Sequence, residues 1–187
     1  MIPLITQTPR LLILAASRAL LTAELHKPQY FPTLLGAVLP ANWPPGDYDR
    51  EAMQYFLEKL TAGGRDAAGW YNWYALRKAE GDTPRTLVGT GGFTGPPTAG
   101  VTELGYSIAA DWRSQGLGTE LVAGLVQQAA ATGQVRRLVA HTPPENVLSQ
   151  RVLLANGFVS EGTDVNGRLR FERAVEPAPH PQLRAPA

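Results

Sequence analysis

The stretch that decides the fold is "DWRSQGLGTELV", residues 111–122, in which two glycines stand directly before an apolar run. The apolar residues that follow recur at helical spacing and predict a helix ending near Gly133: Leu121, Val122, Leu125, Val126 and Ala129. A helix N-terminus carries unpartnered N–H groups and partial positive charge, so it can hold an anion. Gly116 and Gly118 would let a pyrophosphate reach those groups, with Arg113 adding charge at the rim. The loop alone is equally compatible with a tight turn between a strand and a helix.

Two nucleotide-binding motifs are inconsistent with this stretch. A nucleotide P-loop ends in Gly-Lys followed by Ser or Thr, and the chain contains no such tripeptide. A dinucleotide-binding loop needs a third glycine and an acidic residue about 20 positions further on. Here the third position is Leu121, and residues 121–144 contain neither Asp nor Glu. What remains is an anionic ligand held mostly by the backbone.

The composition indicates one compact domain with one active centre. The chain has 187 residues, and we predict a single domain over residues 1–175 followed by a Pro-rich, disordered tail over residues 176–187. With 17 Lys and Arg against 16 Asp and Glu, the net charge is +1 and no basic run occurs, so nucleic acid is not an expected partner. The absence of cysteine excludes disulfides, thiolate zinc sites and a cysteine nucleophile.

The N-terminal stretch over residues 10–25 has a basic start and an apolar middle, as a signal sequence has. Arg18 interrupts the apolar middle and Glu24 follows closely, so we predict a strand leading into a helix instead. Nowhere do about 20 apolar residues run together, as a membrane-spanning helix would require. We therefore expect a cytoplasmic protein with no membrane partner.

Apolar periodicity and turn residues divide the chain into strands and helices. Residues 102–109 alternate between the two faces of a predicted strand, with Leu104, Tyr106 and Ile108 on one face and Glu103, Gly105 and Ser107 on the other. Prolines rule out one long helix through residues 28–46. We predict strands at residues 11–14, 69–80, 85–93, 102–109, 136–142, 157–161 and 168–173, and helices at residues 18–25, from Asp47 or Asp49 to Gly63 and Gly64, from the glycine loop to Gly133, and at residues 147–155.

A second motif lies downstream in "PENVLSQRVLLANGF", residues 144–158. The loop Arg113-x-x-Gly116-x-Gly118 follows the strand "ELGYSIAADW" and precedes, after one further strand, Asn146-x-x-Ser149-x-Arg151 and Gly157-Phe158. Together these motifs closely resemble the GNAT superfamily of acyl-CoA-dependent N-acetyltransferases, and the branch of RimJ and RimL, the ribosomal-protein N-terminal acetyltransferases, is the nearest. The resemblance is strong over residues 103–158.

The resemblance implies an α/β (α+β) fold and acetyl-CoA as co-substrate, with no metal. Helices would flank a central mixed, mostly antiparallel sheet that splays between its fourth and fifth strands, at residues 102–109 and 136–142. The pantetheine arm would lie in the splay against the backbone of Tyr106, Ser107 and Ile108. Asn146 would hold the coenzyme near its thioester, a role that we prefer to that of a helix N-cap alone, whereas Gly157 is best explained as a helix-ending glycine. The pyrophosphate would be wrapped by Arg113, Ser114, Gln115, Gly116, Leu117, Gly118 and Thr119.

Acetyl transfer to a primary amine requires a neutral nitrogen, so a general base is expected. Glu103 is the first candidate because it lies on the strand that would line the coenzyme, on the face opposite Leu104 and Tyr106. His141 is the second because imidazoles titrate close to neutral pH, and some relatives place a catalytic glutamate at its position. Many relatives protonate the leaving thiolate with a tyrosine where this chain has Leu153. Ser149 is the nearest polar substitute, although a hydroxyl is a weak acid.

The acceptor amine stays open at this level. Aromatic residues could line its pocket, but such residues in strands more often belong to the core: Trp43, Trp70, Trp73 and Tyr74. A protein N-terminus and a small-molecule amine are both compatible with the sequence, and the resemblance allows a homodimer through the hairpin near Asn166. The alternative to an enzyme is a non-catalytic acyl-CoA-binding regulatory module, which the loss of the tyrosine at Leu153 would permit.

Overall fold

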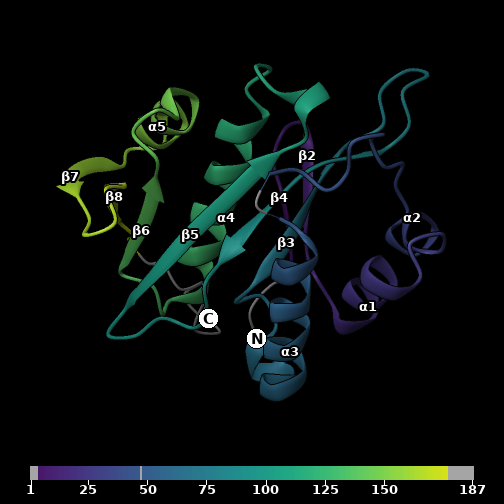
Figure 1. Cartoon of the computed structure of the whole chain (residues 1–187), viewed down its shortest axis with the longest axis horizontal. Helices are drawn as coiled ribbons and strands as arrows, with labels where there is room; N and C mark the ends of the chain where they lie inside the picture. The colour runs from purple at the N-terminus through teal and green to yellow at the C-terminus, as the bar shows by residue number, and fades with distance from the viewer. Residues whose placement is uncertain (1–3, 47, 177–187) are drawn as a thin grey trace, which may run out of the picture.

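The computed structural model describes residues 4–46 and 48–176. Within these residues, eight strands form a single sheet, and helices flank it. The strand order is β1-β2-β3-β4-β5-β6-β8-β7, and β5 and β6 are the one parallel pair in this described sheet (Figure 1). The strands are β1 (Ile5–Gln7), β2 (Leu11–Ala15), β3 (Asn72–Arg77), β4 (Thr86–Phe93), β5 (Val101–Ile108), β6 (Arg137–Thr142), β7 (Val159–Thr163) and β8 (Leu169–Ala174). The helices are α1 (Arg18–His26), α2 (Phe31–Leu35), α3 (Arg50–Ala67), α4 (Leu117–Thr132) and α5 (Val147–Ala155).

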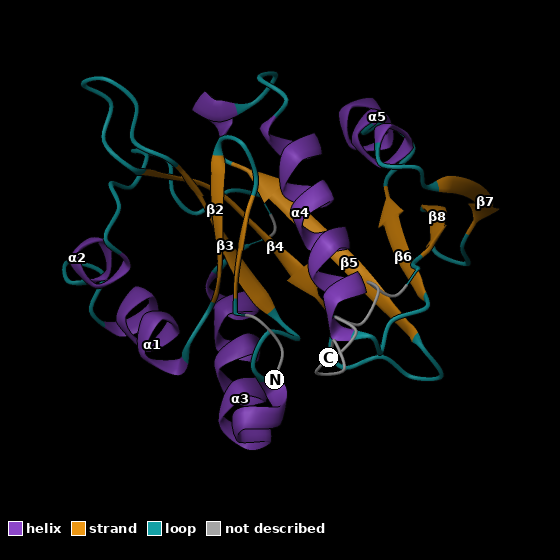
Figure 2. Ribbon diagram, turned by 180° about the vertical axis from the view of Figure 1, so that it is seen from behind, coloured by secondary structure: helices purple, strands orange, loops and turns teal. Residues whose placement is uncertain are grey.

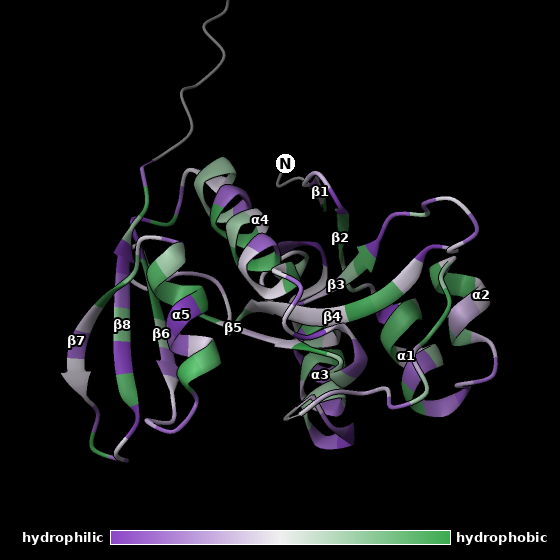
Figure 3. Cartoon of the chain, turned by 90° about the horizontal axis from the view of Figure 1, so that it is seen from above, coloured by the Kyte–Doolittle hydropathy of each residue, from purple (hydrophilic) through white to green (hydrophobic). Residues whose placement is uncertain are grey.

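Helices cover both faces of the sheet and create two apolar cores. On one face α4 packs against the central strands through Leu121 and Leu125, which are fully buried (Figure 2). On the other face α1, α2 and α3 enclose a second core that includes Leu21 and Tyr74 (Figure 3). This layering follows from the alternation of apolar residues along the strands, because successive side chains point to opposite faces.

The parallel pair separates soon after it forms. β5 pairs with β6 only where Val101, Thr102 and Glu103 meet Arg137, Leu138 and Val139. Beyond Glu103 the two strands diverge toward α4 and α5, as Figure 1 shows. The predicted splay between residues 102–109 and 136–142 is therefore confirmed, together with the mixed, mostly antiparallel sheet. It falls between β5 and β6 because β1 adds an N-terminal strand that the sequence did not predict.

Side-chain caps fix the start of three of the helices. Ser17, Asp49 and Asn146 each accept a hydrogen bond from a backbone N–H in the first turn of α1, α3 and α5. α4 differs, because its N-cap is Gly116, which has no side chain and adopts left-handed backbone angles (φ 76°). The N-terminal N–H groups of α4 are thus left open to an approaching ligand.

The remaining differences from the predicted elements have local causes. α3 runs past Gly63 to Ala67, with non-helical angles at Gly64 (φ 56°) that interrupt the helix rather than end it. β3 is shorter than predicted, since Trp70 and Tyr71 precede it. The Pro-rich segment contains the short helix α2, with Pro32 in its first turn, where a missing N–H costs nothing. Residues 177–187 of the predicted tail lie outside the described residues, in which no helix is long and apolar enough to cross a membrane.

Candidate active site

The glycine loop before α4 has the backbone conformation of an anion site. Ser114 and Gly116 both adopt positive φ angles, of 58° and 76°. Left-handed residues alternating with ordinary ones turn successive N–H groups toward one concave side, which suits an anion. A positive φ at a non-glycine residue such as Ser114 is a strained conformation of the kind that often marks a functional loop.

Gly118 brings the start of α4 close to the diverging strands. A Cβ atom added at Gly118 would lie 3.5 Å from Cγ2 of Val152 on α5 and 3.6 Å from Cγ1 of Ile108 on β5. The predicted loop therefore does face the splay. Arg113 extends this contact, since its Nε donates a hydrogen bond of 2.9 Å to the carbonyl oxygen of Ile108 and so ties the loop to the end of β5.

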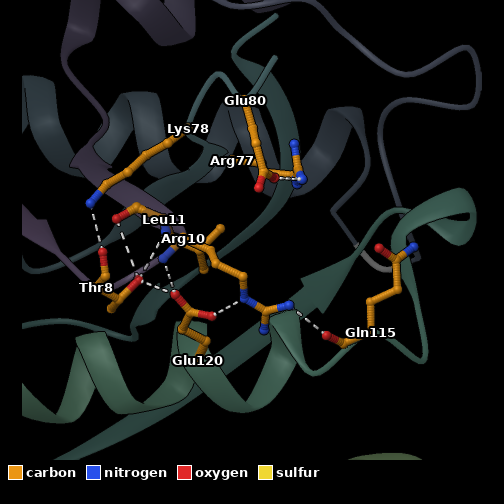
Figure 4. A network of polar contacts seen from close by, with 8 residues as sticks. All are labelled: Thr8, Arg10, Leu11, Arg77, Lys78, Glu80, Gln115 and Glu120. Atoms are coloured by element: carbon orange, nitrogen blue, oxygen red, sulfur yellow. Dashed lines mark hydrogen bonds and ion pairs between the residues drawn. The ribbon is translucent and has the colours of Figure 1, made fainter. Parts of the chain in front are cut away.

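A network on the other side of the loop, absent from the sequence prediction, connects it to the start of β2 (Figure 4). Glu120, in the first turn of α4, accepts hydrogen bonds from Nε of Arg10 (2.7 Å), from the Arg10 backbone N–H (2.6 Å) and from Oγ1 of Thr8 (2.6 Å). The guanidinium of Arg10 also donates to the carbonyl oxygen of Gln115 (2.9 Å). Although burial opposes the shift, these hydrogen bonds from Thr8 and Arg10 hold the pKa of Glu120 below its ordinary value.

The lowered pKa of Glu120 predicts a contribution to stability that depends on pH. The contribution is present above the carboxyl's unfolded pKa of about 4.3 and is lost as the pH falls through the lower folded value. We expect Glu120→Gln to reduce the free energy of unfolding by about 1.5 kcal/mol at pH 7 and to leave it unchanged near pH 2. Urea unfolding of both proteins over that range measures the difference, and an equal loss at both pH values would contradict it.

The two candidate bases lie side by side. Nδ1 of His141 on β6 is 2.9 Å from Oε1 of Glu103 on β5, at the last paired position before the strands diverge. Since an ionised carboxylate can only accept, Nδ1 is the donor in this hydrogen bond. Nε2 lies 3.9 Å from Oδ2 of Asp164, too far for a hydrogen bond. The sequence proposed these two residues as alternatives, and the tertiary structure joins them in one pair.

Glu103 is the more accessible member of this pair. Its side chain is 37% exposed, compared with 9% for His141. A pocket of about 360 Å³ opens beside them, and its lining includes Thr94, Pro96, Thr102, Glu103, His141 and Arg170. The site thus offers a carboxylate, backed by an imidazole, to a molecule in the pocket.

Tyr106 and Ser149 meet across the splay. The hydroxyl of Tyr106 on β5 lies 2.8 Å from Oγ of Ser149 on α5. Burial raises the pKa of Tyr106 to about 12, although the hydrogen bond with Ser149 opposes the shift. Leu153, one turn further along α5, is fully buried in the apolar core. Polar hydrogen-bond donors at this point therefore come from Tyr106 and Ser149.

Other predicted residues have structural partners. Oδ1 of Asn146 accepts the backbone N–H of Ser149 at 3.1 Å, so Asn146 acts as the N-cap of α5. Gly157 ends that helix with φ 75°, and its N–H bonds to the carbonyl of Leu154. Ser107 lies under the segment before α3, where a Cβ added at Gly46 would be 3.1 Å from its Oγ. Among the described residues, no group of three or more His, Cys, Asp or Glu side chains could hold a metal ion.

The aromatic residues belong mainly to the cores. Trp70, Trp73 and Tyr74 are at most 2% exposed. Tyr74 also takes part in a buried network that the sequence did not reveal, in which Glu24 accepts hydrogen bonds from Trp43 (2.7 Å), Tyr48 (2.8 Å) and Tyr74 (2.5 Å). Through Glu24, this network connects Trp43 and Tyr48, in the segment before α3, to Tyr74 on β3 of the sheet. A glutamate within the apolar face of the predicted helix at residues 18–25 was its one signal in the sequence.

Comparison with known proteins agrees with this geometry. Residues 21–159 match the family described as Acetyltransferase (GNAT) domain. The N-acetyltransferase YjdG of Bacillus subtilis (strain 168), itself named as uncharacterized, is 29% identical over 125 residues, which are 67% of this chain and 71% of that protein. The ribosomal-protein-S5-alanine acetyltransferase from Vibrio fischeri superposes with a TM-score of 0.62 at 16% identity, covering 92% of this chain and 97% of that one. RimL, the ribosomal L7/L12 α-N-protein acetyltransferase solved with coenzyme A, gives 0.62 at 18% identity over 95% and 99%.

Proposed function

The chain belongs to the GNAT acetyltransferase family, and from this premise we propose that it transfers the acetyl group of acetyl-CoA to a primary amine. The observation that carries the proposal is the divergence of β5 from β6 directly beside the uncapped N-terminus of α4. In this arrangement an extended pantetheine arm can lie along the edge of β5 that β6 leaves unpaired, while the pyrophosphate of the same coenzyme meets the N–H groups of the loop. RimL, a structural neighbour, was solved in complex with coenzyme A, which supports the same ligand class.

The coenzyme would be held mainly by backbone. The N–H groups of residues 114–119 would bind the pyrophosphate, with Arg113 placed by its bond to Ile108. The backbone of Tyr106, Ser107 and Ile108 would face the pantetheine, because β5 has no strand partner on that side beyond Glu103 among the described residues. Asn146 would act through the position it gives α5 and Ser149.

Glu103 would accept the proton of the acceptor amine, with His141 holding its carboxylate in place. The neutral nitrogen then attacks the thioester carbonyl, the new C–N bond forms, and the C–S bond breaks to release the thiolate of coenzyme A. We assign the proton to Glu103 because its carboxylate is more exposed to the neighbouring pocket than the imidazole is. His141 acts as a positioning residue through its bond of 2.9 Å.

Ser149, which is hydrogen-bonded to Tyr106, would relay a proton to the departing thiolate: its hydroxyl would give a proton to the sulfur while it accepts the proton that the acceptor nitrogen loses on forming the amide. The acceptor is a primary amine of a protein N-terminus or of a small molecule, and the pocket beside Glu103 contributes one arginine, Arg170, as well as the carboxylate. Three features of the protein stay predictions. They are a single domain over residues 1–175, a cytoplasmic location, and a homodimer formed through the hairpin between β7 and β8.

Thermal-shift and calorimetric titrations with acetyl-CoA, CoA and NAD test the cofactor assignment. We expect acetyl-CoA and CoA to bind and NAD not to bind. Gly118→Glu should weaken both coenzymes at least tenfold, because its carboxylate would enter the space between Ile108 and Val152. Gly118 suits this test better than Gly116, whose left-handed backbone would strain any substitution. Gln127→Glu, which adds the same charge at an exposed position further along α4, is the control for general damage.

Turnover of acetyl-CoA with a panel of primary amines tests the reaction itself. Release of free CoA that depends on the added amine, with a matching acetylated product, is the expected result. Coenzyme binding without turnover of any amine would instead favour an acyl-CoA-binding regulatory module. If neither coenzyme binds, the assignment of the loop is wrong and its glycines only turn the chain.

A further inference from the structure

We propose that Arg10 and Glu120 form a brace that sets the pyrophosphate-binding conformation of the loop over residues 113–118, so that both are positioning residues for acetyl-CoA. This inference rests on the proposed function, and it adds two residues that lie outside the predicted site. Arg10 belongs to the turn before β2, and its side chain is 47% exposed, whereas that of Glu120 is 13% exposed.

The brace is held from several directions. Nε and the backbone N–H of Arg10 both donate to the carboxylate of Glu120, and Thr8 adds a third donor. Lys78, which directly follows β3, donates two further hydrogen bonds to this turn. Its Nζ donates to the carbonyl of Thr8 (2.7 Å), and its backbone N–H donates to the carbonyl of Arg10 (2.9 Å). The turn that carries Arg10 is therefore fixed, and its guanidinium reaches the loop from a defined place, as Figure 4 shows.

The bond from Arg10 to Gln115 determines which way the loop N–H groups point. In a trans peptide the C=O and the N–H of the same unit point in opposite directions. Because the carbonyl of Gln115 is held by Arg10, the N–H of Gly116 is directed away from Arg10. That opposite side is where Gly118 faces Ile108 and Val152, since residues 118 and 120 lie about 200° apart around a helix. Arg10 thus directs the N–H of Gly116 toward the splay between β5 and β6.

Arg10 also neutralises the one acidic residue in the first turn of α4. An unpaired Glu120 would repel a pyrophosphate bound at the same helix end, and the ion pair of 2.7 Å removes most of this repulsion. The guanidinium itself lies against the loop, since a Cβ added at Gly116 would be 3.3 Å from its Nη2. Orientation of the peptide and neutralisation of Glu120 both favour an anion at the loop.

If the ion pair only held β2 against α4, its loss would lower kcat/KM equally for every acetyl donor. If it positions the pyrophosphate loop, its loss should affect only donors that contain a pyrophosphate, and this contrast provides the test. We measure kcat/KM of the unmodified protein and of Arg10→Gln with two acetyl donors. One is acetyl-CoA, and the other is S-acetyl-N-acetylcysteamine, a truncated thioester that has no pyrophosphate. For acetyl-CoA we expect a loss of about 5- to 30-fold, mainly in KM, whereas the truncated thioester should change less than about twofold. Arg137→Gln removes another exposed arginine from an ion pair, with Glu172 at 3.2 Å, and should change neither value.

Calorimetry with CoA and dephospho-CoA completes the experiment. Arg10→Gln should weaken both by the same factor, and Glu120→Gln added to it should restore part of the affinity by removing the unpaired charge. A loss confined to CoA would mean that Arg10 contacts the 3′-phosphate, and equal losses for both thioesters would mean a purely structural pair; either result overturns the brace. If the unmodified protein binds no CoA, the proposed function fails and the brace fails with it, whereas normal binding by Arg10→Gln overturns the brace alone.

Discussion

Glu103→Gln is expected to lower kcat for acetyl transfer by about 10²- to 10⁴-fold, the usual contribution of a positioned general base. Glutamine keeps the shape of the side chain and can still meet Nδ1 of His141, so the fold and the coenzyme site should be preserved. Calorimetry should accordingly give the same affinity for acetyl-CoA. Steady-state kinetics with the best amine of the panel measures the loss.

The pH profile distinguishes a lost base from a damaged site. Without Glu103, only amine that is already neutral in solution can react, so kcat/KM of the variant should rise with pH up to the pKa of the amine. Glu161→Gln makes the same substitution on the exposed strand β7 and should leave the kinetics unchanged. A kcat within threefold of the unmodified protein, or a larger loss in His141→Gln, would show that Glu103 is not the base.

Glu24→Ala is expected to lower the free energy of unfolding by about 3 kcal/mol, because it leaves buried donors without an acceptor. Trp43, Tyr48 and Tyr74 all direct their hydrogens at this carboxylate. Burial raises the pKa of Glu24, while its hydrogen bonds oppose the shift. Protonation of Glu24 therefore favours the folded state, so this pH-dependent part of the stability is present at low pH and is lost as the pH rises through the raised folded pKa, whereas the three hydrogen bonds to the carboxylate persist at pH 7.

Urea unfolding at pH 7 measures this loss, and the fluorescence of the tryptophans should report release of the segment that carries Trp43. Glu58→Ala provides the matched control, because Glu58 lies on the exposed side of α3 and bonds only to Gln54 among the described residues. The control should change stability by less than about 0.5 kcal/mol. Equal losses in the two variants would mean that the network around Glu24 contributes nothing beyond helix propensity.

The sequence alone determined most of the order and type of the elements. Caps such as Ser17 and Asp49, the alternation along β5, and the glycines around α4 act over a few neighbouring residues, so their consequences can be predicted locally. The two motifs, in their order and spacing, also indicated the family, and the resemblance to that family implied the splay. The exceptions were short or irregular pieces, such as β1 and α2, whose formation depends on what they pack against.

Only the tertiary structure decided which side chains meet. Glu103 and His141 are 38 residues apart, Tyr106 and Ser149 are 43 apart, and Arg10 and Glu120 are 110 apart. Periodicity states which face of an element a residue occupies and so limits strand register to pairings that keep those faces, but it does not select one of these pairings or say how a helix crosses the sheet. Those quantities are set by packing of the whole core. The sequence therefore supplied the candidate groups, and the fold combined them into pairs.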